Sequence, residues 1–178
     1  MNLIDNTYFV DDISLPGLTT SGSKNVGMDK LIDDLTIGGL SLTRFIKKYQ
    51  TEYLNGLLGK KIAEAFVKGL LEIDNEIWIN LKNQLIDDEL KQSPIANYVY
   101  FFIMRYGLTF TTSKGEKKGK SDYAIAVSSR KPEFAWNRMV EMNFEIVNWF
   151  AKNQKDYESF IDDNSLDDDL FTPINLWI

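Results

Sequence analysis

The sequence of 178 residues contains no cysteine and no histidine. Without cysteine the chain cannot form disulfides, thiolate metal sites or a cysteine nucleophile. Without histidine it lacks the most common general base and a usual ligand of zinc and non-haem iron, and it cannot form a serine–histidine–aspartate triad. The chemistry that remains open to the chain is that of carboxylates and lysines, or none.

Positive charge and long apolar runs are also scarce. The chain has 20 lysines and arginines against 26 aspartates and glutamates, which gives a net charge of −6 and a pI near 4.8. That balance argues against a domain whose main role is to bind phosphate backbones. No signal peptide is recognisable at the start, and no stretch is long and apolar enough to cross a bilayer. We therefore expect a soluble protein that is made and used in a cytoplasm and has no membrane partner.

The most informative stretch that is present is the apolar segment at residues 93–107. Pro94 suits the first position of a helix, Ser93 can cap its first turn, and Gly107 suits its end. Because the residues between them leave no polar face, this helix must be covered on nearly all sides. The sequence therefore predicts a mainly α fold, a bundle of about four to five helices around a central helix at 94–106.

Apolar residues at helical spacing predict the other helices. They are expected at 41–58, 60–71, after Asn75, and from 131 to about 153, with a further turn at 157–161. The apolar stripe of the helix after Asn75 is expected to consist of Ile77, Trp78, Leu81, Leu85 and Ile86.

Residues 108–127 are expected to leave the helical pattern. The β-branched and aromatic stretches at 108–112 and 123–127 can pair as a hairpin around a flexible loop at 113–120, with an extended loop as the alternative. The chain then reads as a single domain, 1–178. It comprises an N-terminal arm with short elements (1–40), a helical core with 108–127 inserted (41–153) and an extended C-terminal arm (154–178).

Two groups of acidic residues are candidate sites. The first lies near the C-terminus and consists of Asp162, Asp163, Asp167, Asp168 and Asp169. It offers oxygen ligands for a hard cation such as calcium, but it lacks the glycine and closing glutamate of an EF-hand, and a solvated acidic linker is the alternative. The second lies near predicted helix ends and consists of Asp74, Glu76, Asp87, Asp88 and Glu89. Nothing in its spacing demands a pair of catalytic carboxylates, and acidic residues at helix starts favour the helix dipole. We expect no catalytic residue, no cofactor and no metal site.

Two further groups are candidates for contacts with other proteins. The lysines of the 113–120 loop either contact a partner or belong to a solvated loop; they are Lys114, Lys117, Lys118 and Lys120. An apolar cluster at the chain end either folds back onto its own domain or docks onto a neighbouring subunit; it consists of Phe171, Ile174, Leu176 and Trp177.

Three segments together resemble a known family. They are residues 45–59 (FIKKYQTEYLNGLLG), 94–102 (PIANYVYFF) and 135–143 (AWNRMVEMN). Their order and spacing resemble small head–tail connector proteins of tailed bacteriophages, also called adaptor or head-completion proteins. The resemblance is strongest to those of phages of Bacteroides-like hosts, and it covers about residues 41–152.

The resemblance implies a structural protein of the virion without enzymatic activity. Such proteins are helical bundles that assemble in the host cytoplasm as a ring, commonly twelve-fold, below the portal at the head–tail junction. The ring extends the DNA channel, lets DNA pass without sequence-specific binding, and docks the tail. The implied partners are the portal protein, neighbouring copies of the chain, and a tail or next-ring protein.

Two other functions remain open at this point. One is a small helical module that binds or regulates another protein and has no role in a virion. The other is a carboxylate-dependent, metal-assisted hydrolase, which would show saturable binding of divalent cations.

Overall fold

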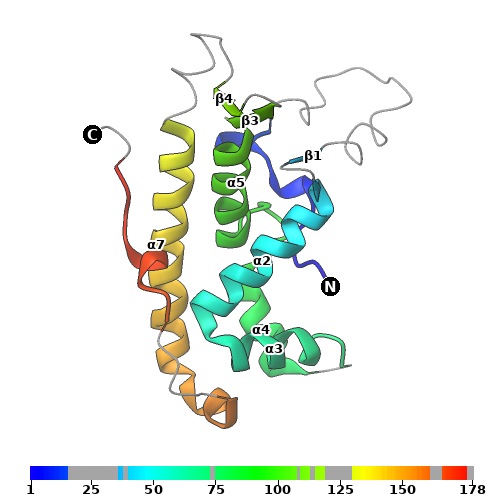
Figure 1. Cartoon of the computed structure of the whole chain (residues 1–178). Helices are drawn as coiled ribbons and strands as arrows, with labels where there is room; N and C mark the ends of the chain where they lie inside the picture. The colour runs from blue at the N-terminus through cyan, green and yellow to red at the C-terminus, as the bar shows by residue number, and fades with distance from the viewer. Residues whose placement is uncertain are drawn as a thin grey trace.

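The computed structural model describes residues 1–15, 36–37, 40–72, 75–107, 109–112, 115–118, 130–160 and 166–175. For 36–37, 106–107, 109–112 and 115–118 it describes the backbone. The chain is mainly helical (Figure 1), which confirms the predicted fold class.

Helix α5 (Pro94–Gly107) is the central helix of the bundle, as predicted. It packs against α2 (Leu42–Leu58) and against the long helix α7 (Arg130–Lys152). Ser93 Oγ accepts the N–H of Ile95 at 3.1 Å, which satisfies one of the free donors of the first turn. The buried residues of this helix are Pro94, Ile95, Ala96, Asn97, Tyr98, Val99, Tyr100, Phe101 and Ile103.

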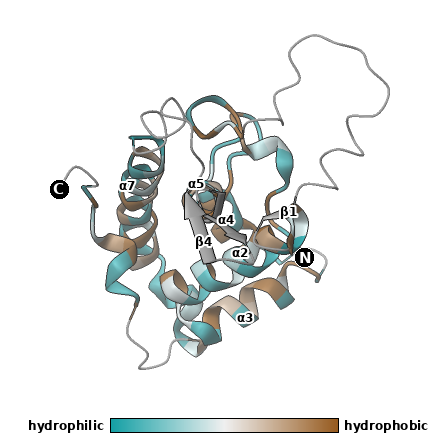
Figure 2. Ribbon diagram, turned by 45° about the horizontal axis from the view of Figure 1, so that its top comes forward, coloured by the Kyte–Doolittle hydropathy of each residue, from teal (hydrophilic) through white to brown (hydrophobic). Residues whose placement is uncertain are grey.

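The other helices follow in the predicted order along the chain. They are α2, α3 (Lys60–Gly69), α4 (Glu76–Leu85) and α7, followed by the 3₁₀ segment η3 (Gln154–Phe160). Helix α3 packs against α2 and η3. Gly59 has φ 77° and separates α2 from α3 without a gap, because glycine adopts positive φ without a Cβ clash. The ribbons of α3 and α7 change between teal and brown along their turns, as expected for amphipathic helices (Figure 2).

Helix α4 differs from its prediction in two details. Ile77 is 38% exposed, and Ile86 is buried but follows the helix, so the buried residues of α4 are Trp78, Leu81 and Leu85. Asn75 was expected to precede the helix and could cap it, but its side chain makes no capping hydrogen bond; its amide nitrogen donates to Glu72 at 3.3 Å.

The segment after α5 forms a hairpin whose second strand differs from the prediction. Strand β3 (Thr109–Thr112) pairs antiparallel with β4 (Gly115–Lys118), so Thr109 lies opposite Lys118. The predicted loop at 113–120 therefore contains a strand, and the predicted strand at 123–127 lies outside the described residues. A connection of two residues closes a hairpin at a lower entropic cost than a long one, which outweighs the low strand propensity of the sequence GEKK. A second short pair, β1 (Thr36–Ile37) with β2 (Leu40–Ser41), precedes α2.

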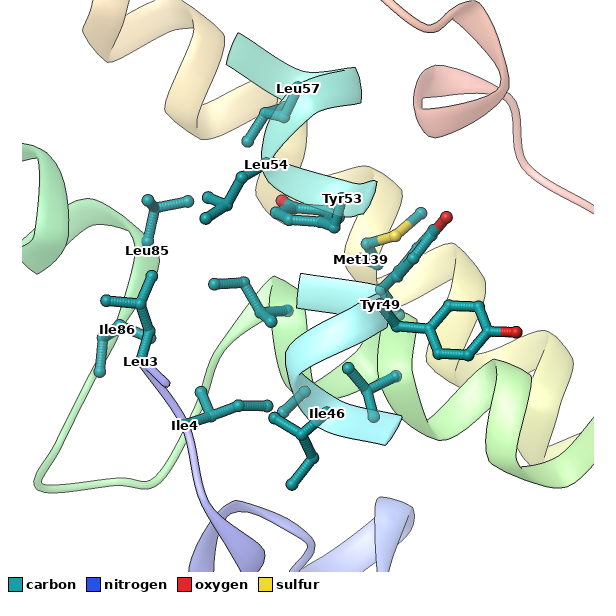
Figure 3. Close-up of a cluster of buried hydrophobic side chains, with 14 of the residues drawn as sticks. Leu3, Ile4, Ile46, Tyr49, Tyr53, Leu54, Leu57, Leu85, Ile86 and Met139 are labelled. Carbon is teal, nitrogen blue, oxygen red and sulfur yellow. The ribbon is translucent and has the colours of Figure 1, made fainter. Parts of the chain in front are cut away.

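Residues 1–15, which the sequence assigned to an arm, are part of the core. This N-terminal segment contains two short 3₁₀ turns, η1 (Asn6–Tyr8) and η2 (Asp11–Ile13). Its buried residues are Leu3, Ile4, Tyr8, Phe9, Ile13 and Leu15. Figure 3 shows Leu3 next to Ile86 and Ile4 near Ile46 of α2, so the segment closes one side of the helical core.

Candidate functional site

The C-terminal residues 166–175, here called the strap, run along α7 (Figure 1). The strap contains the 3₁₀ segment η4 (Asp168–Phe171), and Asp167 caps it by accepting the N–H of Asp169 at 3.1 Å. Leu170 is 1% exposed, and Phe171 and Ile174 are partly buried against the core. The described part of the chain end therefore folds back onto its own domain.

Side chains of α7 hold the strap by its main chain. The Asn137 amide donates to the carbonyl of Ile174 at 3.0 Å and accepts the Ile174 N–H at 2.8 Å. The indole N–H of Trp136 donates to the carbonyl of Thr172 at 2.9 Å. These bonds involve main-chain atoms of the strap, so they fix its path and direction independently of its side chains.

Asn143 connects the strap to the interior of the bundle. This residue is fully buried, and its amide nitrogen donates to the carbonyl of Leu170 at 2.7 Å. Its amide oxygen accepts the hydroxyl of Tyr53 on α2, and burial raises the pKa of Tyr53 well above its ordinary value. A buried amide left without partners would be costly, so Asn143 requires a carbonyl at the position that Leu170 fills.

Gly56 of α2 lets the strap approach the bundle closely. The N–H of Asp167 donates to the carbonyl of Gly56 at 3.0 Å. A Cβ at position 56 would lie 2.8 Å from Leu170 Cδ1 and 3.2 Å from Asp167 Cβ, so a side chain there would push the strap outward. We call the surface formed by Gly56, Trp136, Asn137 and Asn143 the strap groove.

Two apolar patches lie on the outer surface along α7. The Phe134 patch consists of Val10, Leu90 and Phe134, which are 39%, 61% and 49% exposed. The three residues line one surface cleft of about 130 Å³, together with polar and charged residues such as Asp11 and Arg138. The Phe144 patch consists of Phe144, also 49% exposed, and the strap residue Phe171, whose rings meet edge to face with centroids 5.6 Å apart. The two phenylalanines of α7 are ten residues apart, a separation of roughly 15 Å along the helix.

A polar cluster fastens the N-terminal segment to the loop between α4 and α5. The hydroxyl of Tyr8 donates to the carboxylate of Asp88, and the amines of Lys82 and Lys91 each lie 3.7 Å from that carboxylate. The hydrogen bond from Tyr8, followed by the two lysine charges, lowers the pKa of Asp88. A surface cleft of about 430 Å³ lies beside the cluster. The charged groups of the cluster, Asp88, Lys82 and Lys91, are already paired with one another. We therefore interpret the cluster as an attachment of the N-terminal segment to this loop.

The predicted contact lysines lie in and around the hairpin. Lys117 and Lys118 are in β4, whereas Lys114 and Lys120 lie outside the described residues. At the chain end, Leu176 and Trp177 also lie outside them. Phe171 and Ile174 thus both contact α7. No contact between these two residues and the described lysines of β4 is seen.

The acidic candidates lie on the surface. Asp87, Asp88 and Glu89, the carboxylate of Glu76 and those of Asp167, Asp168 and Asp169 are all exposed, while Asp74, Asp162 and Asp163 lie outside the described residues. Within the described ranges, no three carboxylates gather closely enough to hold a metal ion. Likewise, none of the helices described is long and apolar enough to cross a membrane.

The groove residues were not expected from the sequence, although one signal was present. Asn143 occupies a position in the apolar stripe of α7, and Gln50 occupies such a position in α2. A polar side chain at a core position must find a partner, and in both places that partner is the main chain of a terminal segment.

Comparisons of the chain with protein-family models, with curated proteins and with solved structures find no match.

Proposed function

We propose that the protein is a structural virion component, a head–tail adaptor that forms a ring below the portal of a tailed phage. In this role it extends the DNA channel and docks the tail, and the packaged DNA passes through without sequence-specific binding. The proposal starts from the resemblance of residues 41–152 to such connectors. Those residues include the central helix α5 and most of the helices around it.

The observation that carries the proposal is the presence of two separate apolar patches on one subunit. A ring forms when one patch on each subunit fits a different patch on the next, so each subunit needs two. The Phe134 patch and the Phe144 patch are distinct in position and composition. Each contains a phenylalanine of α7, the longest helix described, which keeps the spacing of Phe134 and Phe144 fixed.

The exposed acidic residues support the same role. Asp167, Asp168 and Asp169 lie side by side on the strap and are exposed. An acidic surface facing the channel would repel DNA and let it slide, because like charges repel. In the proposed ring this part of the strap faces the channel.

The experiment is the native mass of the protein alone and mixed with the portal protein of the same phage. We expect a ring-sized complex with the portal. The double variant Leu90→Asp/Phe134→Asp places charges on the Phe134 patch and should abolish that complex without changing the urea midpoint. Leu71→Asp is the matched control, because Leu71 is 70% exposed and belongs to neither patch.

A discrete small oligomer that ignores the portal would overturn the proposal. That result would favour the small protein-binding module instead.

A further inference from the structure

The strap groove recognises features that every copy of this chain carries. Its three hydrogen-bonding side chains on α7 all address main-chain atoms of the strap, at residues 170, 172 and 174. The strap of a second copy presents the same atoms in the same order. The groove therefore fits a strap from a neighbour as well as its own.

The strap is attached by a small apolar contact. Leu170 is its one fully buried side chain among residues 166–175, and Phe171 and Ile174 are partly buried against the core. Residues 166–169, 172, 173 and 175 are exposed. Detachment of the strap therefore exposes far less apolar surface than unfolding of the bundle, and it needs correspondingly less free energy.

An empty groove, in contrast, is unfavourable. The amide of Asn143 would lose the carbonyl of Leu170, and the space that Gly56 provides would be unfilled. A subunit that gives its strap away thus offers a vacant groove to another strap. In a closed ring, each subunit can give its strap to one neighbour and receive that of the other, so that every groove stays filled.

We propose that the strap groove is a docking site for residues 166–175 of a second copy of this chain, and that neighbouring subunits of the assembly exchange straps. The cyclic form of the exchange rests on the proposed ring. Six Cα–Cα steps join Phe160 to Leu166, a reach of at most roughly 20 Å. The recipient groove must therefore begin within this distance of Phe160 of the donor subunit.

The test is cross-linking between two full-length variants, and the absence of native cysteine leaves no background thiols. One variant carries Phe144→Cys on α7, and the other carries Phe171→Cys on the strap. In the structure these two positions face each other within one chain. After mixing, assembly on the portal and treatment with a short bismaleimide, a dimer of the two variants forms when the strap of one lies on α7 of the other. Leu71→Cys mixed with Phe171→Cys measures collisional cross-linking.

We expect the mixed dimer to exceed the collisional control several-fold, and addition of Gly56→Ala to the Phe144→Cys partner to reduce it. The double variant Phe144→Cys/Phe171→Cys should lose its intramolecular cross-link on assembly and form chains linked between subunits. If the portal complex forms but the mixed dimer stays at the control level, the exchange is wrong and the proposed function stands.

If the double variant forms neither cross-link in the assembly, another molecule fills the groove, and the exchange is again wrong. If the wild-type chain forms no portal complex, the proposed function fails. Loss of the complex in the cysteine variants alone reflects their altered Phe144 patch. In either case the mixed dimer is measured in the concentrated protein alone, where a control-level yield overturns the exchange.

Discussion

At the two ends of the chain, an amide side chain of a helix holds the main chain of a terminal segment. Near the N-terminus, Gln50 of α2 accepts the N–H of Leu3 at 2.6 Å and donates to the carbonyl of Met1 at 3.2 Å. Near the C-terminus, Asn137 of α7 accepts the N–H of Ile174 and donates to its carbonyl. The chemistry is the same, but the N-terminal segment buries six apolar side chains and the strap fully buries Leu170.

This difference separates two roles that are easily confused. The amide bonds determine where each segment lies, because they depend on direction and register. The buried apolar area determines how firmly the segment is held, because the net contribution of a hydrogen bond is modest. The N-terminal segment is therefore a part of the core, whereas we predict that the strap leaves its groove while the bundle stays folded.

The largest effect on the free energy of unfolding is expected from a matched pair of side-chain truncations, one in each terminal segment. Phe9→Ala, at a residue 4% exposed, should lower the free energy of unfolding by about 3–5 kcal/mol. Leu170→Ala should lower it by about 2 kcal/mol or less, because the strap can detach locally before the bundle unfolds. Urea unfolding followed by circular dichroism measures both. Val10→Ala, at a 39% exposed neighbour of Phe9, is the control, and it should shift the free energy by less than about 0.5 kcal/mol. Equal losses for Phe9 and Leu170 would show that the strap is as integral as the N-terminal segment.

A smaller effect is expected from removal of the two amides. Gln50→Ala leaves the N–H of Leu3 without an acceptor in a buried setting, at a cost of about 1–3 kcal/mol. Asn137→Ala should cost about 1 kcal/mol or less, since Asn137 is partly exposed and water can replace its bonds. Asn148→Ala, at an exposed position of α7, controls for helix propensity in the same urea experiment. A greater loss of unfolding free energy in Asn137→Ala than in Gln50→Ala would contradict this prediction.

The smallest expected effect is a pH dependence of stability. It should arise at the N-terminal segment, which is fastened by the charged Asp88, and not at the strap. The hydrogen bond from Tyr8 and the charges of Lys82 and Lys91 lower the pKa of Asp88 below its ordinary value of 3.8. Because the folded-state pKa is the lower one, this stabilisation is present above the ordinary value and is lost as the pH falls through the folded-state pKa. The wild type should therefore lose more stability than Asp88→Asn when the pH is lowered below about 4. Urea midpoints of both proteins at a series of pH values measure this, and parallel curves would contradict the role of Asp88. Trp136, Asn137 and Asn143, which hold the strap, do not titrate.

The parts of the fold that could be predicted from the sequence are those with strong local signals. The central helix has a capping serine, a proline at its start, a glycine at its end and a continuous apolar interior, and each signal agrees with the others. The second strand of the hairpin could not be predicted, because its GEKK sequence has low strand propensity and its pairing follows from a tight connection.

The N-terminal segment and the strap groove lacked such signals. The buried residues of the N-terminal segment fit neither a helical nor a strand period, since the segment follows the surface of the bundle. Phe171 and Ile174 were candidates for contact, but the residues that receive the strap lie on α7 and α2, far away in sequence. Only the polar residues within apolar stripes pointed to them.

The most direct test of the difference between the two ends is hydrogen exchange at one pair of amides. The N–H groups of Leu3 and Ile174 each donate to a side-chain amide oxygen, so their local bonding is alike. We predict that the Leu3 amide exchanges only with opening of the core and responds to urea, while the Ile174 amide exchanges faster through detachment of the strap and responds little. Equal exchange rates with the same urea dependence would show that both ends belong to one cooperative unit and would contradict the account.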